Sequence, residues 1–201
     1  MFAKLFDPGS RFWTIVGTVP LLIALSFLWI VCSLPVVTVI PASVALYDAV
    51  HKYVIPGHQG CFTHFFATLK KEFRGTWKLS LLWVGLFALQ FLMQFGLSGT
   101  HWEYANFAVF LCRTNMVLIV LYLCWLVPLQ SRFELSFGAL HKNALILFVA
   151  CLPYTLACFA ILALLTAGCL LFLPLSLVVP ALIPLMDHFF VEKAFQKYFP
   201  Q

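Results

Sequence analysis

The chain has 201 residues, of which 63% are hydrophobic and only 9% are charged, and its formal net charge is +5. About a quarter of the residues of a soluble domain are charged, because much of its surface must face water. The composition therefore excludes a soluble globular domain and indicates an all-α, polytopic bundle of helices in a lipid bilayer. The basic residues form no tail or arm, so we expect no nucleic-acid partner.

The first apolar run extends from Phe12 to Tyr47 and is interrupted by Pro35 and Pro41. A helix needs about 20 apolar residues to cross a bilayer. We therefore predict one span over about residues 12–34. Residues 36–53 then form a shorter element at the interface or partly re-entrant, and the alternative is that they complete a sixth span.

Residues 61–78 predict an amphipathic helix that lies flat on the cytoplasmic membrane surface. Its aromatic side chains recur at helical spacing, and its charged side chains mostly lie on the other side. This pattern is typical of a helix in the interface, and the alternative is a docking surface for a protein partner. The residues that define this interfacial or docking surface are Phe62, Phe66, Phe73, Trp77, Lys70, Lys71 and Arg74.

The next two spans are predicted over about residues 79–100 and 107–128. Arg113 is the one charged residue within a predicted span, and such a charge is a functional hypothesis by default. It could snorkel outward or hydrogen-bond to Gln90 or Gln94. The alternative is a role toward a substrate or lipid, in a polar intramembrane site formed by Arg113, Asn115, Gln90 and Gln94.

The run from Asn143 to Met186 would reach about 66 Å as a single helix, twice the bilayer core. We predict a hairpin with its break at Thr166-Ala167-Gly168, giving spans over about 144–165 and 169–185. Three prolines predict kinks in the second of these spans. Residues 187–199 predict a second amphipathic helix on the cytoplasmic surface. The count is thus about five spans plus two interfacial helices in one membrane domain, 1–201.

Basic residues concentrate between the first and second spans, after the third span and in the C-terminal tail. The positive-inside rule places these segments, and with them the C-terminus, in the cytoplasm. With five spans the N-terminus lies outside, and with six it lies inside.

The motifs of common active sites and metal centres are missing from the sequence. The seven cysteines form no Cys-x-x-Cys pair, and the six histidines form no zinc-protease motif. His51, His58 and His64 share one segment, but we expect them to be interfacial polar residues, so no metal, cofactor or catalytic residue is predicted. No acidic residue lies in the middle of a predicted span.

Several short motifs, taken in their order and spacing, resemble the YesL-like family of bacterial integral membrane proteins, a group defined by a domain of unknown function. The resemblance covers nearly the whole chain. The motifs are Ser33-Leu34-Pro35-Val36-Val37-Thr38, Ala45-Leu46-Tyr47, Phe65-Phe66 with Lys70, Glu72 and Phe73, Pro128-Leu129, Arg132-Phe133-Glu134, Lys142-Asn143-Ala144-Leu145 and Phe195-Gln196-Lys197-Tyr198.

The resemblance implies a location in the bacterial cell membrane and a non-enzymatic, accessory role in carbohydrate uptake, because genes of such proteins often lie beside importers of the ATP-binding-cassette (ABC) type. Permease or ATPase subunits are then the expected partners, besides the bilayer itself. The alternative is an independent transporter or channel for a small solute, and a membrane sensor is a weaker one. The sequence leaves the ligand and the oligomeric state open.

Overall fold

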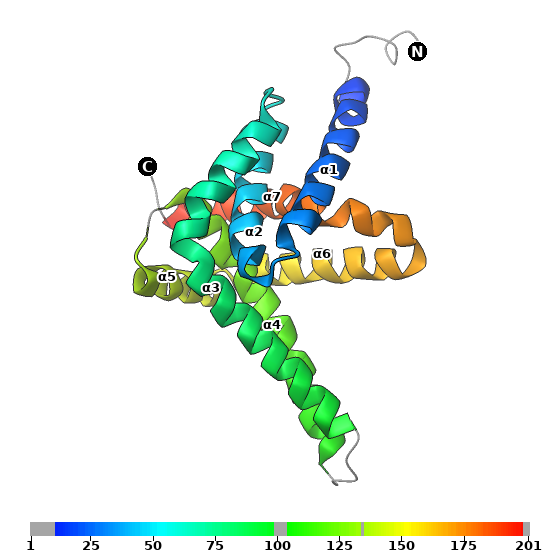
Figure 1. Ribbon diagram of the computed structural model, residues 1–201, viewed down its shortest axis with the longest axis vertical. Coiled ribbons are helices and arrows are strands. Elements are labelled where there is room, and N and C mark those ends of the chain that lie inside the picture. The colour runs from blue at the N-terminus through cyan, green and yellow to red at the C-terminus, as the bar shows by residue number, and fades with distance from the viewer. Residues whose placement is uncertain (1–10, 99–103, 134, 199–201) are drawn as a thin grey trace.

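The computed structural model describes residues 11–98, 104–133 and 135–198 (Figure 1). Within these ranges the chain forms helices joined by turns and no strand, so the predicted all-α fold is confirmed. The elements are α1 (Arg11–Ser33), η2 (Val36–Thr38), α2 (Val39–Ala49), η3 (Val50–Val54), α3 (Cys61–Ser98), α4 (Ala105–Arg132), α5 (Phe137–Ala150), α6 (Leu152–Leu171), η4 (Leu173–Leu177) and α7 (Val179–Tyr198).

Three of these helices are long and apolar enough to cross a membrane: Cys61–Leu97, Ala105–Arg132 and Leu152–Leu171. Two shorter apolar helical stretches are also present: Thr18–Ser33, which is part of α1, and Phe137–Ala150, which is α5. The last part of α3 and the first part of α4 extend away from the other helices, and α6 forms a second hairpin with η4 and the start of α7 (Figure 1). The predicted end of one span at residues 99–100 and the end of the tail helix at Phe199 lie outside the described residues.

The short helix α2 forms the centre of the molecule. Nine of its residues are buried, and it contributes to both hydrophobic clusters: Ile40 and Val44 to one, Ala45 and Leu46 to the other. Protein therefore covers most of α2, while the partly re-entrant position of residues 36–53 and the alternative of a sixth span stay predictions. Neighbouring helices pack against it from several sides, and Ser80 Oγ of α3 accepts a hydrogen bond from the Ile40 N–H at 3.1 Å.

Residues 61–78 do not form a separate helix. They are the first half of α3, which continues without interruption to Ser98. At 1.5 Å per residue these 38 residues extend about 57 Å, well beyond the roughly 30 Å of a bilayer core. The prediction of a helix lying flat beside a separate span is wrong, since no proline separates the two parts and Gly75 stays helical.

The predicted hairpin is present, but its break lies at Phe172, a few residues after the predicted Thr166-Ala167-Gly168. A second break, which was not predicted, lies at Cys151, and α6 starts there with Pro153 in its first turn. Proline has no N–H for the helix ladder but fits a first turn. Gly168 lies within α6, where a Cβ atom would meet Leu175 Cδ2 at 2.9 Å. This glycine leaves room for the Leu175 side chain of η4 against α6.

The C-terminal helix α7 packs one side against protein, while Met186 and Phe189 on it remain exposed. Val191, Ala194 and Phe195 are buried in the cluster that also contains Trp125 and Leu129 of α4. Protein thus covers three apolar residues of the predicted helix over 187–199, and its location on the cytoplasmic membrane surface stays a prediction. At the other end of α7, Ser26 Oγ of α1 accepts a hydrogen bond from the Ala181 N–H at 3.0 Å and donates one to the Val178 carbonyl at 3.2 Å.

The continuity of α3 can be tested at Gly75, which is exposed and has open space where a Cβ atom would lie. We expect Gly75→Ala to stabilise the protein by about 0.5–1 kcal/mol, because alanine favours a helix interior. Gly75→Pro should destabilise it by about 3 kcal/mol. Thermal unfolding in detergent measures both effects.

Gly85 in the second half of α3 provides the matched control, because it also has open space around it. Gly85→Ala should give a gain similar to that of Gly75→Ala. If Gly85→Ala stabilises the protein while Gly75→Ala destabilises it, α3 is hinged at Gly75 and the continuous helix is incorrect.

Candidate functional site

Polar side chains gather where η3, the first half of α3, the end of α4 and α7 meet, and we call this region the polar junction. It consists of two hydrogen-bonded networks, one around Asp48 and one around Arg132. Its members are Asp48, His51, Lys52, His64, Thr68, Ser131, Arg132, His188 and Glu192. Part of it lies on η3, a single π-helical turn, and such turns often occur at functional sites.

Asp48 is the centre of the first network and is only 4% exposed. Its Oδ1 forms an ion pair with Lys52 Nζ at 2.8 Å, and its Oδ2 lies 2.6 Å from His64 Nε2. Thr68 Oγ1 donates to Oδ2 at 3.2 Å, and Ser131 Oγ donates to Oδ1 at 3.5 Å. Three helical segments, α3, α4 and η3, thus supply partners to one buried carboxylate.

Burial by itself would raise the pKa of Asp48, but hydrogen bonds and positive charge from Lys52 and His64 outweigh this effect and lower it. Asp48 is therefore ionised at neutral pH. The neighbouring Thr68 and His64 do not make this group a catalytic triad. In a triad the acid and the nucleophile bind opposite nitrogens of the imidazole, whereas here Asp48 and Thr68 both contact Nε2.

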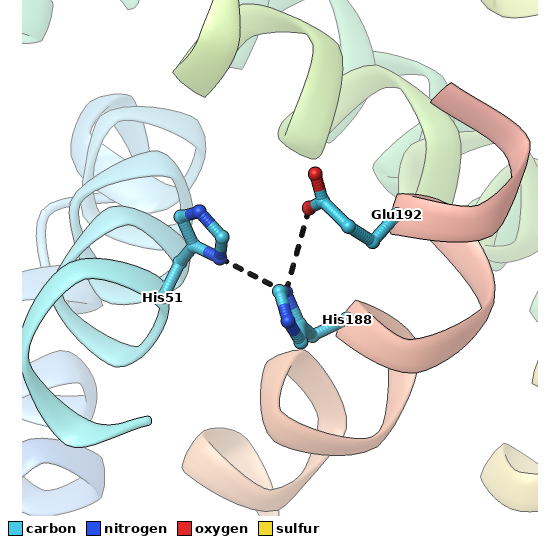
Figure 2. A group of neighbouring side chains, drawn as sticks. All are labelled: His51, His188 and Glu192. Carbon is cyan, nitrogen blue, oxygen red and sulfur yellow. Dashed lines mark hydrogen bonds and ion pairs between the residues drawn. The ribbon is translucent and has the colours of Figure 1, made fainter. Parts of the chain in front are cut away.

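Arg132 is the centre of the second network. Its Nη2 atom donates to His51 Nε2 at 2.7 Å and forms an ion pair with Glu192. His51 Nδ1 lies 2.9 Å from His188 Nδ1, and Figure 2 shows the side chains of His51 and Glu192 approaching His188 from two sides. The network joins η3 to α4 and α7.

His51, His188 and Glu192 offer ligand atoms within 4.8 Å of one another, a donor set that suits zinc. Arg132 conflicts with this use. A guanidinium only donates hydrogen bonds, so His51 Nε2 must accept, and the proton of the neutral ring lies on Nδ1. That Nδ1–H donates to His188, and the charge of Glu192 is already matched by Arg132. A metal could bind only after Arg132 moved away.

Burial lowers the pKa of His51, and the nearby positive charge of Arg132 lowers it further. Burial also lowers the pKa of His188, although Glu192 opposes the change. Both rings are consequently neutral at neutral pH, which agrees with the single Nδ1–H···Nδ1 hydrogen bond between them. The second network is an arginine–carboxylate pair that is extended by two neutral histidines.

The histidines that share one segment of the sequence separate in the structure. His64 belongs to the Asp48 network and His51 to the Arg132 network, while His58 is exposed in the turn before α3. The partners of His51 are far away in the sequence, at positions 132 and 188.

Two of the four residues predicted to form an intramembrane polar site come together. Gln90 and Asn115 line one cavity of about 410 Å³ between α3 and α4, together with Thr114. Gln94 does not line it, and the exposed Arg113 does not line it either. The amide atoms Gln90 Oε1 and Gln94 Nε2 are buried without a hydrogen-bond partner among the described residues.

The predicted aromatic residues of α3 remain exposed, with fractions of 40% for Phe62, 50% for Phe66, 43% for Phe73 and 39% for Trp77. Lys70, Lys71 and Arg74 are exposed as well. On the other side of the helix, Cys61 and Phe65 are buried against η3 and α2. The surface defined by the sequence is therefore present, on a helix that leaves it uncovered.

Asp48, Arg132 and Asp187 were not predicted as site residues from the sequence. A signal existed for the two acids: Asp48 follows a run of 36 uncharged residues, and Asp187 follows a run of 44. A lone carboxylate at such a position is usually buried with a partner. For Asp48, the i,i+4 spacing indicates Lys52 as a partner, whereas Ser131 comes from a distant part of the chain and could not be found from local patterns.

The neutral histidines predict a pH dependence of stability. Their pKa values are lowered below the ordinary value of 6.5, so the unfolded chain binds more protons than the folded chain once the pH falls below about 6.5. Stability should therefore decrease as the pH is lowered from 7.5 to 5.5. Thermal unfolding of the wild type and of a His51→Gln, His188→Gln double variant measures the contribution of the two rings.

Asp187, whose pKa is raised to about 6 by burial, changes stability in the opposite direction in part of this range. The measured quantity must therefore be the difference in thermal stability between the wild type and the double variant at each pH. We expect the loss of stability on lowering the pH to be smaller in the double variant. Identical pH dependence of both proteins would show that the histidines are not neutral partners of Arg132.

Part of the polar junction lies in a region of the chain that matches a protein family. Residues 22–96, less than half of the chain, match a family described as a protein of unknown function, DUF624. The matched region includes Asp48, His51 and His64, and it ends before Arg132 and α7. Comparison with curated proteins and with solved structures gave no match.

Proposed function

We propose that this chain is a non-enzymatic, multi-pass protein of the bacterial cell membrane that serves as an accessory component of an ABC-type carbohydrate uptake system. The observation that supports the proposal is the uncovered aromatic and basic surface on the first half of α3. The type of transport system is suggested by the resemblance to the YesL-like family.

The length of α3 determines what can cover this surface. If residues 79–97 cross the bilayer, they account for about 28 Å, and the first half of α3 extends roughly 27 Å farther. Lipid headgroups at the membrane surface cannot cover a helix along such a length. A protein partner can, so the exposed Phe66 and Phe73 favour docking over membrane anchoring.

Charge supports a cytoplasmic location of this surface. Basic residues gather at the end of the α3–α4 hairpin where α3 begins and α4 ends, and basic residues are enriched in cytoplasmic segments. They are Lys70, Lys71 and Arg74 on α3, Arg132 on α4, and Lys52, which Asp48 links to both helices. Because Arg132 binds Glu192, the C-terminal part of α7 lies at that end too. We infer that the C-terminus is cytoplasmic and that the partner presents an acidic surface with an apolar slot.

The proposal is tested by affinity purification of the tagged chain from native bacterial membranes in mild detergent. We expect permease or ATPase subunits of an ABC importer to co-purify and to be identified by mass spectrometry. A variant with Phe66→Ser, Phe73→Ser, Lys70→Glu and Arg74→Glu should lose roughly tenfold or more of the partner, because central aromatic and charged residues dominate such interfaces.

The matched control changes the same residue types outside the surface: Phe137→Ser with Lys142→Glu on α5, where both side chains are exposed. This control should retain the partner. The proposal fails if the native chain purifies without any importer subunit, or if both variants lose the partner equally.

A second candidate function, an independent small-solute transporter or channel, is favoured by the cavity between α3 and α4, because two amide side chains line it. In this case the purified chain alone should mediate solute flux in liposomes. Asn115→Leu with Gln90→Leu should abolish the flux, whereas Arg113→Leu, outside the cavity, should reduce it less. Absence of flux from correctly folded protein would eliminate this candidate.

A further inference from the structure

A second cavity, of about 400 Å³, lies between α1, α2, α4, α6 and α7. Its walls are mainly apolar, with Leu46, Val120, Leu123 and Ile183 among the lining residues. Cavities of this size and composition bind small molecules, usually through a few polar groups that converge on the ligand. It is separate from the docking surface on α3 and from the cavity lined by Gln90.

Two polar side chains line this cavity without satisfying their hydrogen-bonding capacity. Tyr47 and Asp187 are each only 3% exposed, and Tyr47 Oη and Asp187 Oδ1 have no hydrogen-bond partner among the described residues. Other polar groups of the lining are satisfied: Trp29 Nε1 donates to Ser43 Oγ at 3.1 Å. Buried polar atoms are nearly always paired in folded proteins, so these two atoms require an explanation.

The charge of Asp187 indicates the kind of partner that is missing. Burial raises the pKa of this carboxyl to about 6, while hydrogen bonds from the thiols of Cys158 and Cys124 oppose the rise. The carboxyl is thus mostly ionised at neutral pH, and neither thiol provides a positive charge. A buried carboxylate is normally matched by a cation, as Asp48 is by Lys52.

We propose that this cavity binds a small molecule with an apolar body and one protonated amine. The ammonium group donates a hydrogen bond to Asp187 Oδ1 and a second one to Tyr47 Oη, and the hydrocarbon part contacts the apolar walls. The ligand thereby supplies both the missing hydrogen bonds and the missing positive charge. This inference does not depend on the proposed accessory function, because a partner on α3 and a ligand in the cavity contact different residues.

The test uses two probes with the same carbon skeleton, cyclohexylmethylamine and cyclohexylmethanol. Binding of the tritiated probes is measured on the full chain in lipid nanodiscs, with empty nanodiscs subtracted for partitioning into lipid. We expect saturable binding of the amine, one molecule per chain, and binding of the alcohol that is roughly tenfold weaker. A hydrogen bond to a charged group accounts for a difference of this size.

Two variants of unchanged shape locate the site. Asp187→Asn should weaken binding of the amine roughly tenfold, and Tyr47→Phe should weaken it about fivefold. Glu72→Gln is the control, because Glu72 is a half-buried carboxylate that Gln130 hydrogen-bonds outside the cavity. This variant should bind the amine like the wild type. Thermal unfolding confirms that each variant is folded.

The proposal is wrong if the amine shows no saturable binding to the folded wild type, which would mean that the cavity holds only water or lipid. It is also wrong if the alcohol binds as tightly as the amine and Asp187→Asn has no effect. If the folded Glu72→Gln variant weakens binding as much as Asp187→Asn does, the amine binds elsewhere and the assigned site is incorrect.

Discussion

The burial of the Asp48 carboxylate, together with the short helix that bears it, is the constraint on which the arrangement of the other helices depends. A carboxylate placed among apolar helices destabilises the protein unless cations and hydrogen-bond donors surround it. Lys52 provides the charge, and His64, Thr68 and Ser131 make hydrogen bonds to the carboxylate. Because these partners belong to η3, α3 and α4, satisfying one side chain fixes how three segments meet.

The Arg132 network likewise fixes the position of α7 by matching a charge on it, that of Glu192. Glu192 and His188 connect this helix to α4 and η3, and Val191 and Phe195 bury its apolar side in the same place. Polar pairing therefore sets the position and orientation of α7, while apolar burial supplies most of the stabilisation. A site of this kind is more suited to holding helices together than to chemistry, because its charges are already matched.

The composition and the apolar runs were sufficient to predict a helical membrane protein, and the spacing of Phe62, Phe66, Phe73 and Trp77 was sufficient to predict one exposed helical face. Helix boundaries were less predictable. Hydropathy changes sharply near Trp77, but α3 continues through this change because no proline or cap stops it. In the uniformly apolar run after Lys142, by contrast, the helix breaks just before Pro153. The polar junction was not predictable, because Asp48, Arg132 and Glu192 come from distant segments.

The hydrogen bonds of Ser26 also affect how the protein assembles during synthesis. Ser26 lies on α1, yet both of its partners, Val178 and Ala181, are made more than 150 residues later. Until then α1 has no partner at this position, and the cluster around α2 lacks Ala181. The centre of the molecule therefore closes late, after α7 has emerged from the ribosome. In the meantime α1 and α2 must be kept from other partners by the membrane insertion machinery or by the bilayer.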